Sequence, residues 1–149
     1  MATITEDYVS FETAKLLKEK GFDDIDCECY GWIGRSGKHY SVDDTFYDDE
    51  ELKEAQEDRK DFVPLITLQM AMKWLREVHN IYIYATPWYH EEENPLKKGE
   101  YNPVFNGWGY NISNLTTNTV IAESDEDNLY STPEQACEIA IKYYLEKLW

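Results

Sequence analysis

Cys27, Cys29 and His39 come closest to a chemical site, because together they could provide ligands for a metal ion. Two cysteines two residues apart lie on the same face of a strand, and His39 is predicted to lie across a hairpin from them. Structural zinc sites usually have wider cysteine spacing and a fourth ligand, which here would have to be Cys137 or a distant histidine. We therefore predict no metal or other cofactor, with zinc at Cys27 and Cys29 as the alternative.

Two further motifs each lack a required residue. Gly34 to Lys38 resembles part of a phosphate-binding loop, but Trp32 stands where that loop needs glycine and His39 where it needs serine or threonine. The run from Asp125 begins like a calcium-binding loop, but Tyr130 occupies the position that requires glycine. The sequence also lacks a nucleophile elbow. We therefore predict no catalytic residue and a protein that is not an enzyme.

The charge of the chain restricts its partners. The 149 residues include 30 Asp and Glu against 14 Lys and Arg, which gives a formal charge of -16. Such a charge repels nucleic acid and anionic lipid and attracts a basic surface. We therefore predict a protein partner and no direct binding to nucleic acid or to membranes. Two interpretations of the charge stay open: it attracts a basic surface on the partner, or it serves solubility alone.

The sequence also indicates a compartment. Its apolar stretches are much shorter than a membrane helix requires, and residues 1–21 lack the pattern of a secretory signal. The 3 cysteines are an odd number, which does not suit a disulfide framework. We therefore expect a protein of the reducing cytoplasm.

The first and last predicted helices have clear cap signals. Ser10 is the N-cap of a helix that ends at Lys20, and Gly21 follows as a left-handed stop. Thr132 is the N-cap of the final helix, where Gln135 completes a capping box. The buried stripe of the final helix is predicted to contain Cys137, Ala140, Ile141, Tyr144, Leu145 and Leu148.

The central helix is predicted over residues 64–80, where apolar residues repeat at helical spacing. Asn80 is expected to end this helix in a left-handed conformation. The predicted core stripe contains Leu68, Ala71, Met72, Leu75 and Val78, and it is widened by Met70 and Trp74.

Alternating patterns predict two hairpins and a single strand. These strands are 27–33 with 38–42, 81–85 alone, and 105–115 with 119–124. Pro87 is expected to end the single strand, and residues 90–103 are expected to form a long exposed loop. The order of elements predicts a single α+β domain over residues 1–149, with an antiparallel sheet of about five strands and three helices packed mainly on one face.

Aromatic residues are concentrated between Tyr82 and Tyr110. Most of them are expected to be ordinary sheet and core residues. Trp88, Tyr89 and Tyr101 fall in the predicted loops, where Trp and Tyr often dominate binding energies. We therefore predict that these three contact a partner. Alternatively, the region 82–110 encloses a small-ligand pocket or an active site.

Residues 43–61 form an acidic segment with 10 carboxylates and 3 basic residues. A segment that is polar on nearly all sides buries little surface and is often mobile, so we expect a weak surface helix or an ordered loop. On a helix that rises about 1.5 Å per residue, the carboxylates would span a length adequate for a few DNA phosphates, which leaves open an imitation of a polyanion. The residues assigned to such a partner surface are Asp48, Asp49, Glu50, Glu51, Glu54 and Glu57.

One family resemblance follows from these segments. The run Thr67 to Ile81, TLQMAMKWLREVHNI, resembles a signature segment of small uncharacterised proteins from phages and prophages of anaerobic gut bacteria. Ser10 to Phe22 and Glu134 to Ala136 are similar too, whereas 43–61 and 90–103 are less typical. The resemblance implies a mobile-element origin and assigns no activity, cofactor or catalytic residue.

Together, these features predict a non-enzymatic accessory protein of phage or prophage origin that binds another protein. Two alternatives stay open. One is a small-ligand module or enzyme that uses the aromatic region 82–110, and the other is an acidic mimic of nucleic acid that uses residues 43–61.

Overall fold

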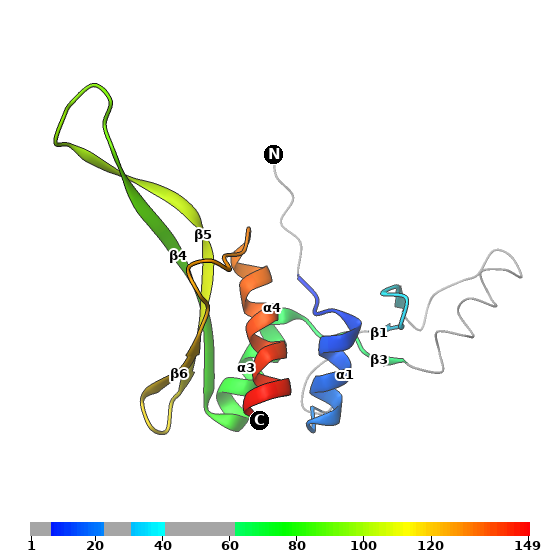
Figure 1. Cartoon of the computed structure of the whole chain (residues 1–149). Coiled ribbons are helices and arrows are strands. Elements are labelled where there is room, and N and C mark those ends of the chain that lie inside the picture. Colours follow the sequence, from blue (N-terminus) through cyan, green and yellow to red (C-terminus); the bar gives the residue numbers. More distant parts are fainter. Residues whose placement is uncertain (1–6, 23–30, 41–61) are drawn as a thin grey trace, which may run out of the picture. The chain divides into compact units, whose positions relative to one another are not determined.

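The computed structural model describes residues 7–22, 31–40 and 62–149, which form an α+β fold (Figure 1). The chain divides into two compact units. Unit 1 comprises residues 1–74 and 145–149, and unit 2 comprises residues 75–144. The predicted α+β class is confirmed. The acidic segment 43–61 lies outside the described residues.

Unit 1 contains α1 (Phe11–Glu19), which begins and ends at the predicted caps. The Ser10 side chain accepts a hydrogen bond from the backbone N–H of Thr13, at 3.3 Å. After the helix, Gly21 has a φ of 100°, and the N–H of Phe22 donates to the carbonyl of Leu17 at 2.9 Å. This is the Schellman arrangement, in which glycine adopts the left-handed conformation without a steric penalty.

A small antiparallel sheet completes this unit. It contains β1 (Trp32–Ile33), β2 (His39–Tyr40) and β3 (Val63–Pro64), in the order β2-β1-β3. The predicted hairpin between 27–33 and 38–42 is confirmed where it is described, because Ile33 pairs with His39. The rest of both predicted strands lies outside the described residues.

The central helix, α3 (Leu68–His79), begins later than predicted. Residues 63 and 64 pair with β1, and the Thr67 hydroxyl accepts a hydrogen bond from the N–H of Met70 at 3.1 Å, so Thr67 is the N-cap. Leu68, Ala71, Trp74 and Leu75 are buried. The prediction was wrong for Val78, which is 58% exposed. The spacing of apolar residues identifies which face of a helix is buried, but not how far along the helix the elements that cover this face extend.

Unit 2 is built on a second antiparallel sheet, with strand order β4-β5-β6. Its strands are β4 (Ile81–Glu93), β5 (Tyr101–Asn114) and β6 (Thr119–Glu123). The helix α4 (Pro133–Tyr143) lies against β4 and β5, beside the base of their hairpin (Figure 1). Ile83 pairs with Ile112, and both are buried. The described strands thus make two three-stranded sheets, and a single sheet of about five strands is not confirmed.

The final helix starts as predicted and ends differently. The Thr132 hydroxyl accepts from the N–H of Gln135 at 3.1 Å, whereas the Gln135 side chain accepts from the Ser131 hydroxyl instead of closing the capping box. After α4 the winding widens into the π-helix η1 (Tyr144–Leu148). This change of period explains why Leu148, predicted to be buried, is exposed.

The hairpin of β4 and β5 extends much further than predicted. Pro87 does not end β4, and the predicted loop 90–103 contains strand residues up to Glu93 and from Tyr101 onward. Trp108 exchanges backbone hydrogen bonds with Tyr130, both at 2.8 Å, so the backbone groups of Trp108 point away from β4. The nitrogen of Pro87, which pairs with Trp108, therefore faces the free edge of β4, where no donor is needed.

Substituting Gly109 is expected to disrupt this hairpin. A Cβ at Gly109 would overlap the indole nitrogen of Trp88 and lie 2.6 Å from the Ser124 hydroxyl oxygen. Gly109→Ala should therefore lower the free energy of unfolding by about 1–3 kcal/mol, measured by urea denaturation. Asn102→Ala, at an exposed position of the same strand, is the control and should change it by less than about 0.5 kcal/mol. Equal stability of Gly109→Ala and the parent protein would contradict this packing.

Candidate functional site

The predicted metal ligands are not brought together by the described residues. Cys27 and Cys29 lie outside them. His39 is exposed on β2, where its ring makes an edge contact with Tyr8 at 5.1 Å between centroids. Across residues 7–22, 31–40 and 62–149, no group of three or more His, Cys, Asp or Glu side chains could hold a metal ion.

The third cysteine lacks the properties of a nucleophile. Cys137 is buried in α4, and burial, assisted by the charge of Glu134, raises the pKa of its thiol to about 11. A thiol with this pKa is protonated at neutral pH, whereas both metal binding and nucleophilic attack require the thiolate. Cys137 therefore serves as a small apolar residue of the core of unit 2.

The six carboxylates assigned to a partner surface, Asp48 to Glu57, lie outside the described residues, but the three aromatic candidates lie within them. Trp88 and Tyr89 are in β4, and Tyr101 begins β5, so none lies in a loop. Tyr89 and Tyr101 are each 57% exposed. Trp88 is half-buried over Gly109, so its predicted exposure was wrong.

Tyr89 and Tyr101 belong to a larger aromatic surface on the far part of the hairpin. Tyr89 pairs with Phe105, which is 49% exposed, and the two rings meet edge to face with centroids 5.7 Å apart. Phe105 in turn meets Trp108 at 5.8 Å. We call Tyr89, Tyr101, Pro103 and Phe105 the distal aromatic face.

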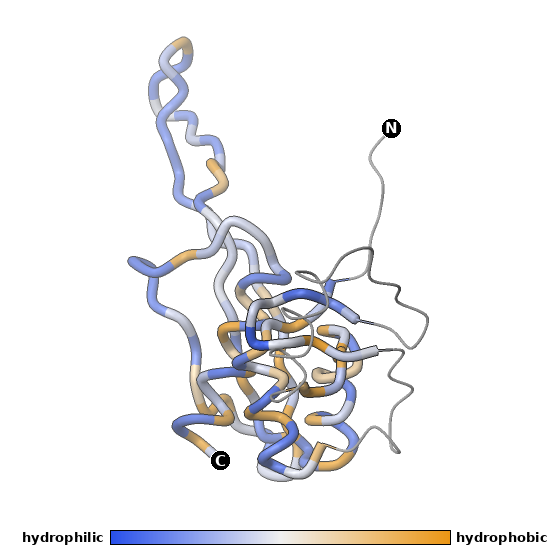
Figure 2. Tube along the Cα trace, turned by 90° about the vertical axis from the view of Figure 1, so that its right-hand side faces the viewer, coloured by the Kyte–Doolittle hydropathy of each residue, from blue (hydrophilic) through white to orange (hydrophobic). Residues whose placement is uncertain are grey.

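The distal aromatic face continues the sheet face that α4 covers nearer the base. Alternate residues of a strand share a face, so Ile83, Pro87 and Tyr89 point to the same side of β4. Ile83 is buried with Ile112 where α4 lies against the hairpin. Beyond α4 the hairpin extends alone within unit 2, and its far part is mainly hydrophilic in hydropathy (Figures 1 and 2). The exposed rings are therefore an aromatic surface on an otherwise polar arm.

The opposite side of the same arm carries a polar network. The imidazole of His90 shares hydrogen bonds with the side chains of Glu92, at 2.8 Å, and Asn106. The bond to Glu92, followed by the bond to Asn106, raises the pKa of His90 above its usual value of 6.5. On the face that carries the rings, Glu93 accepts from the N–H of Gly99 in the connecting turn at 2.9 Å. The bond between His90 and Asn106 links β4 to β5 on the face opposite the rings, and the bond between Gly99 and Glu93 links β4 to the turn.

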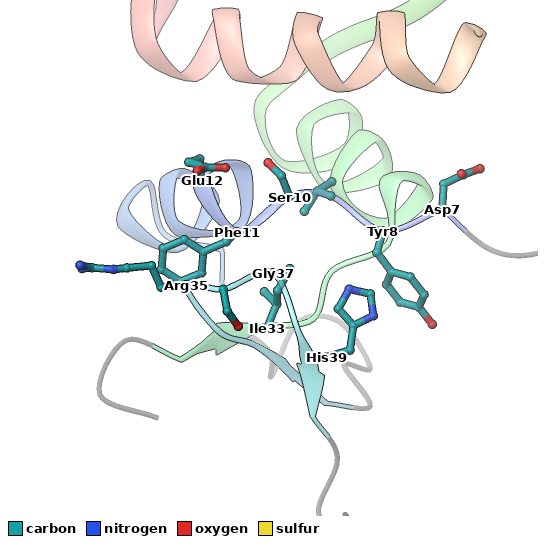
Figure 3. Close-up of a pocket in the computed structure, with 11 residues that line it drawn as sticks. Asp7, Tyr8, Ser10, Phe11, Glu12, Ile33, Arg35, Gly37 and His39 are labelled. Atoms are coloured by element: carbon teal, nitrogen blue, oxygen red, sulfur yellow. The ribbon is translucent and has the colours of Figure 1, made fainter. Parts of the chain in front are cut away.

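A cavity of about 480 Å³ lies in unit 1, between the start of α1 and the hairpin of β1 and β2 (Figure 3). Tyr8 and His39 lie together at one end, and Phe11 lies nearer the other. The guanidinium of Arg35 points outward, away from Tyr8 and His39. The walls thus present mixed charges and no converging set of groups, which does not define a reaction.

A second cavity, of about 390 Å³, lies in unit 2 beside β6 and α4. Of residues 82–110, Tyr110 is the only one that lines either of these two cavities. Most residues of that aromatic region instead belong to the paired strands β4 and β5. The pocket predicted as an alternative for region 82–110 therefore gains little support from these two cavities.

Phe105 is a candidate contact residue that the sequence pattern alone did not single out. It was assigned to a strand, and no partner role was given to it. Its pairing opposite Tyr89 is the signal that reveals it, and that signal appears only once the register is known.

A scan of protein-family models and searches of curated proteins and solved structures found no match to this chain. Within the described residues, no helix is both long enough and apolar enough to cross a membrane. The site must therefore be interpreted from its own geometry.

Removing the carboxylate beside His90 tests the polar network. Glu92→Gln should lower the pKa of His90 toward 6.5, measured by NMR titration of the ring protons, because the charged acceptor that favours imidazolium is lost. As the folded pKa is raised, the contact is strongest below pH 6.5 and weakens as the pH rises through the folded value. Glu100→Gln, at the turn, removes a carboxylate that pairs with Lys97 and is the control. An unchanged pKa in Glu92→Gln would contradict the network.

Proposed function

We propose that this protein works by binding another protein through the distal aromatic face of the β4–β5 hairpin. The observation that carries the proposal is the set of exposed rings, Tyr89, Tyr101 and Phe105, on the paired strands β4 and β5. Tyr and Phe provide large apolar areas with only two rotatable side-chain bonds, so ordering them on binding costs little entropy. Neighbouring exposed aromatic rings are typical of interaction surfaces rather than of scattered surface residues.

The chemistry of the arm favours a basic partner. Tyr89, Glu91 and Glu93 occupy every second position of β4, so the two carboxylates lie on the same face as the rings. The whole chain has a formal charge of -16, which disfavours nucleic acid as a ligand. Arginine and lysine can lie over aromatic faces while they pair with carboxylates. The proposed partner surface therefore combines apolar pockets with Arg or Lys side chains.

The proposed setting is phage biology in a bacterial cytoplasm. This part of the proposal rests only on the resemblance of Thr67 to Ile81, Ser10 to Phe22 and Glu134 to Ala136 to phage and prophage proteins. An accessory protein that binds a host or phage factor needs no catalytic residue and no cofactor. The distal aromatic face could provide that binding without chemistry.

Site-specific crosslinking tests the proposed surface. A photo-crosslinking amino acid at Phe105 should capture one partner in the bacterial host, whereas the same group at Tyr82 should not. Tyr82 is a suitable control because it is 40% exposed and lies on the opposite face of β4, stacked on Tyr84 at 5.2 Å. Equal capture of the same proteins from both positions would contradict the proposal.

Affinity for the purified partner gives the second test. Tyr89→Ser combined with Phe105→Ser should weaken the Kd at least about tenfold, because hot-spot rings each contribute about 1–2 kcal/mol or more. Glu91→Gln should mainly slow association and reduce its dependence on salt. Tyr82→Ser is the matched control and should leave the Kd unchanged. An unchanged Kd in the double variant would overturn the proposed surface.

A further inference from the structure

The cavity of about 390 Å³ in unit 2 has an unusual lining. Three tyrosines, Tyr110, Tyr130 and Tyr143, reach it from β5, from the segment before α4, and from the end of α4. The remaining lining residues are Ile121, Ala122, Glu123, Ser124, Asp125 and Asn128. None of the nine residues is basic, and two are carboxylates. The site therefore combines aromatic rings, a small apolar wall and negative charge.

The walls of this cavity are held by backbone hydrogen bonds. Ser124 donates its N–H to the carbonyl of Tyr110 at 3.0 Å, and its hydroxyl accepts from the N–H of Tyr110 at 2.8 Å. Tyr130 is fixed by its two backbone bonds to Trp108. The N–H of Asn128 donates to the carbonyl of Asp125 at 3.1 Å, which closes the turn between them. A preformed wall lowers the entropy lost when a ligand binds.

The rings of Tyr110 and Tyr130 lie close together at this cavity, and Asp125 is among its lining residues. The rings of Tyr110 and Tyr130 lie 6.4 Å apart between centroids, with an angle of 30° between their planes. Burial raises the pKa of Tyr110, and the nearby Tyr130, Tyr143 and Asp125 raise it further. The phenol of Tyr110 is therefore held in its neutral form, and Asp125 adds a carboxylate near it. Such a setting stabilises a positive charge.

We propose that this cavity binds an alkylammonium group, either of a small amine or of a lysine side chain. Aromatic faces attract ammonium ions through the negative potential of their π electrons, and methylated ammonium ions suit such cages because they are weakly hydrated. Ile121 and Ala122 provide apolar contacts for the attached methyl or methylene groups. The volume lies within the range of about 300–1,000 Å³ that is usual for ligand pockets.

An organic cation fits the lining better than a metal ion. Neutral phenols are weak metal ligands, and the cavity offers only the carboxylates of Glu123 and Asp125 as charged donors. Calcium, by comparison, takes about six to eight oxygen ligands. The aromatic component would also be unused by a metal ion.

Binding of choline to the full chain tests the proposal against its neutral isostere, 3,3-dimethylbutan-1-ol. In NMR titrations, choline should shift the ring resonances of Tyr110, Tyr130 and Tyr143 in a saturable manner, whereas the alcohol should bind at least about tenfold more weakly. Equal binding of the alcohol would overturn the proposal, because a purely apolar cavity does not distinguish charge. The absence of saturable shifts with choline and with N-acetyl-lysine amide would also overturn it.

Two variants locate the site. Tyr143→Leu keeps an apolar side chain at a position that is 39% exposed and should weaken choline binding about tenfold, while Asp125→Asn should weaken it by a smaller factor. Tyr82→Leu, at a position of β4 that is 40% exposed and outside both proposed surfaces, is the control and should have no effect. Unchanged affinity in Tyr143→Leu would overturn the proposal. Folding of each variant is verified by its unchanged NMR spectrum away from the cavity.

The two possible sources of the ammonium group are compared directly. Tighter binding of N-acetyl-lysine amide than of choline would support a lysine side chain of a partner, and the reverse would support a free amine. Both results support an ammonium site. This site is independent of the distal aromatic face, so Tyr89→Ser with Phe105→Ser should leave choline binding intact while it weakens the protein partner.

Discussion

The antiparallel pairing of β4 with β5 is the interaction on which the rest of unit 2 depends. The register that begins with Ile81 opposite Asn114 brings Ile83 and Ile112 together beneath α4, which anchors the base of the hairpin. From that anchored base the strands continue to Glu93 and Tyr101 and carry the distal aromatic face. The other edge of β5 pairs with β6, which forms one wall of the cavity lined by Tyr110, Tyr130 and Tyr143, here called the tyrosine cavity. The pairing of β4 with β5 therefore determines the geometry of both proposed binding surfaces.

A β-bulge decides which residues form the distal aromatic face. The register shifts between Trp88, which pairs with Gly107, and Tyr89, which pairs with Phe105, so Asn106 is the extra residue. Strict alternation would place Phe105 on the same face as Gly107, away from Trp108. With one residue inserted, Phe105 instead contacts Trp108, and Asn106 turns to the other face and bonds to His90. The bulge thus places Phe105 beside Tyr89 on one side of the arm and Asn106 beside His90 on the other.

The sequence predicted those elements whose signals are local. Ser10, Gly21 and Thr132 determine helix ends through bonds to residues only a few positions away, and each was placed correctly. The extent of β4 and β5 depends instead on pairing between distant residues. Pro87 was interpreted as a strand end, yet its nitrogen faces a free edge, where proline is tolerated. Residues 90–93 were predicted to be a loop because they are polar. Where both faces of a hairpin are exposed, apolar and polar residues no longer alternate, so the sequence pattern of a strand disappears.

The candidate sites were predictable in part only. Tyr89 and Tyr101 could be named from composition, because aromatic residues flanked by polar residues are expected to be exposed. The tyrosine cavity could not, because Tyr110, Tyr130 and Tyr143 come from three separate elements and no spacing in the sequence relates them. Both surfaces contain negatively charged side chains. In each surface carboxylates accompany aromatic rings, a combination that favours cationic groups.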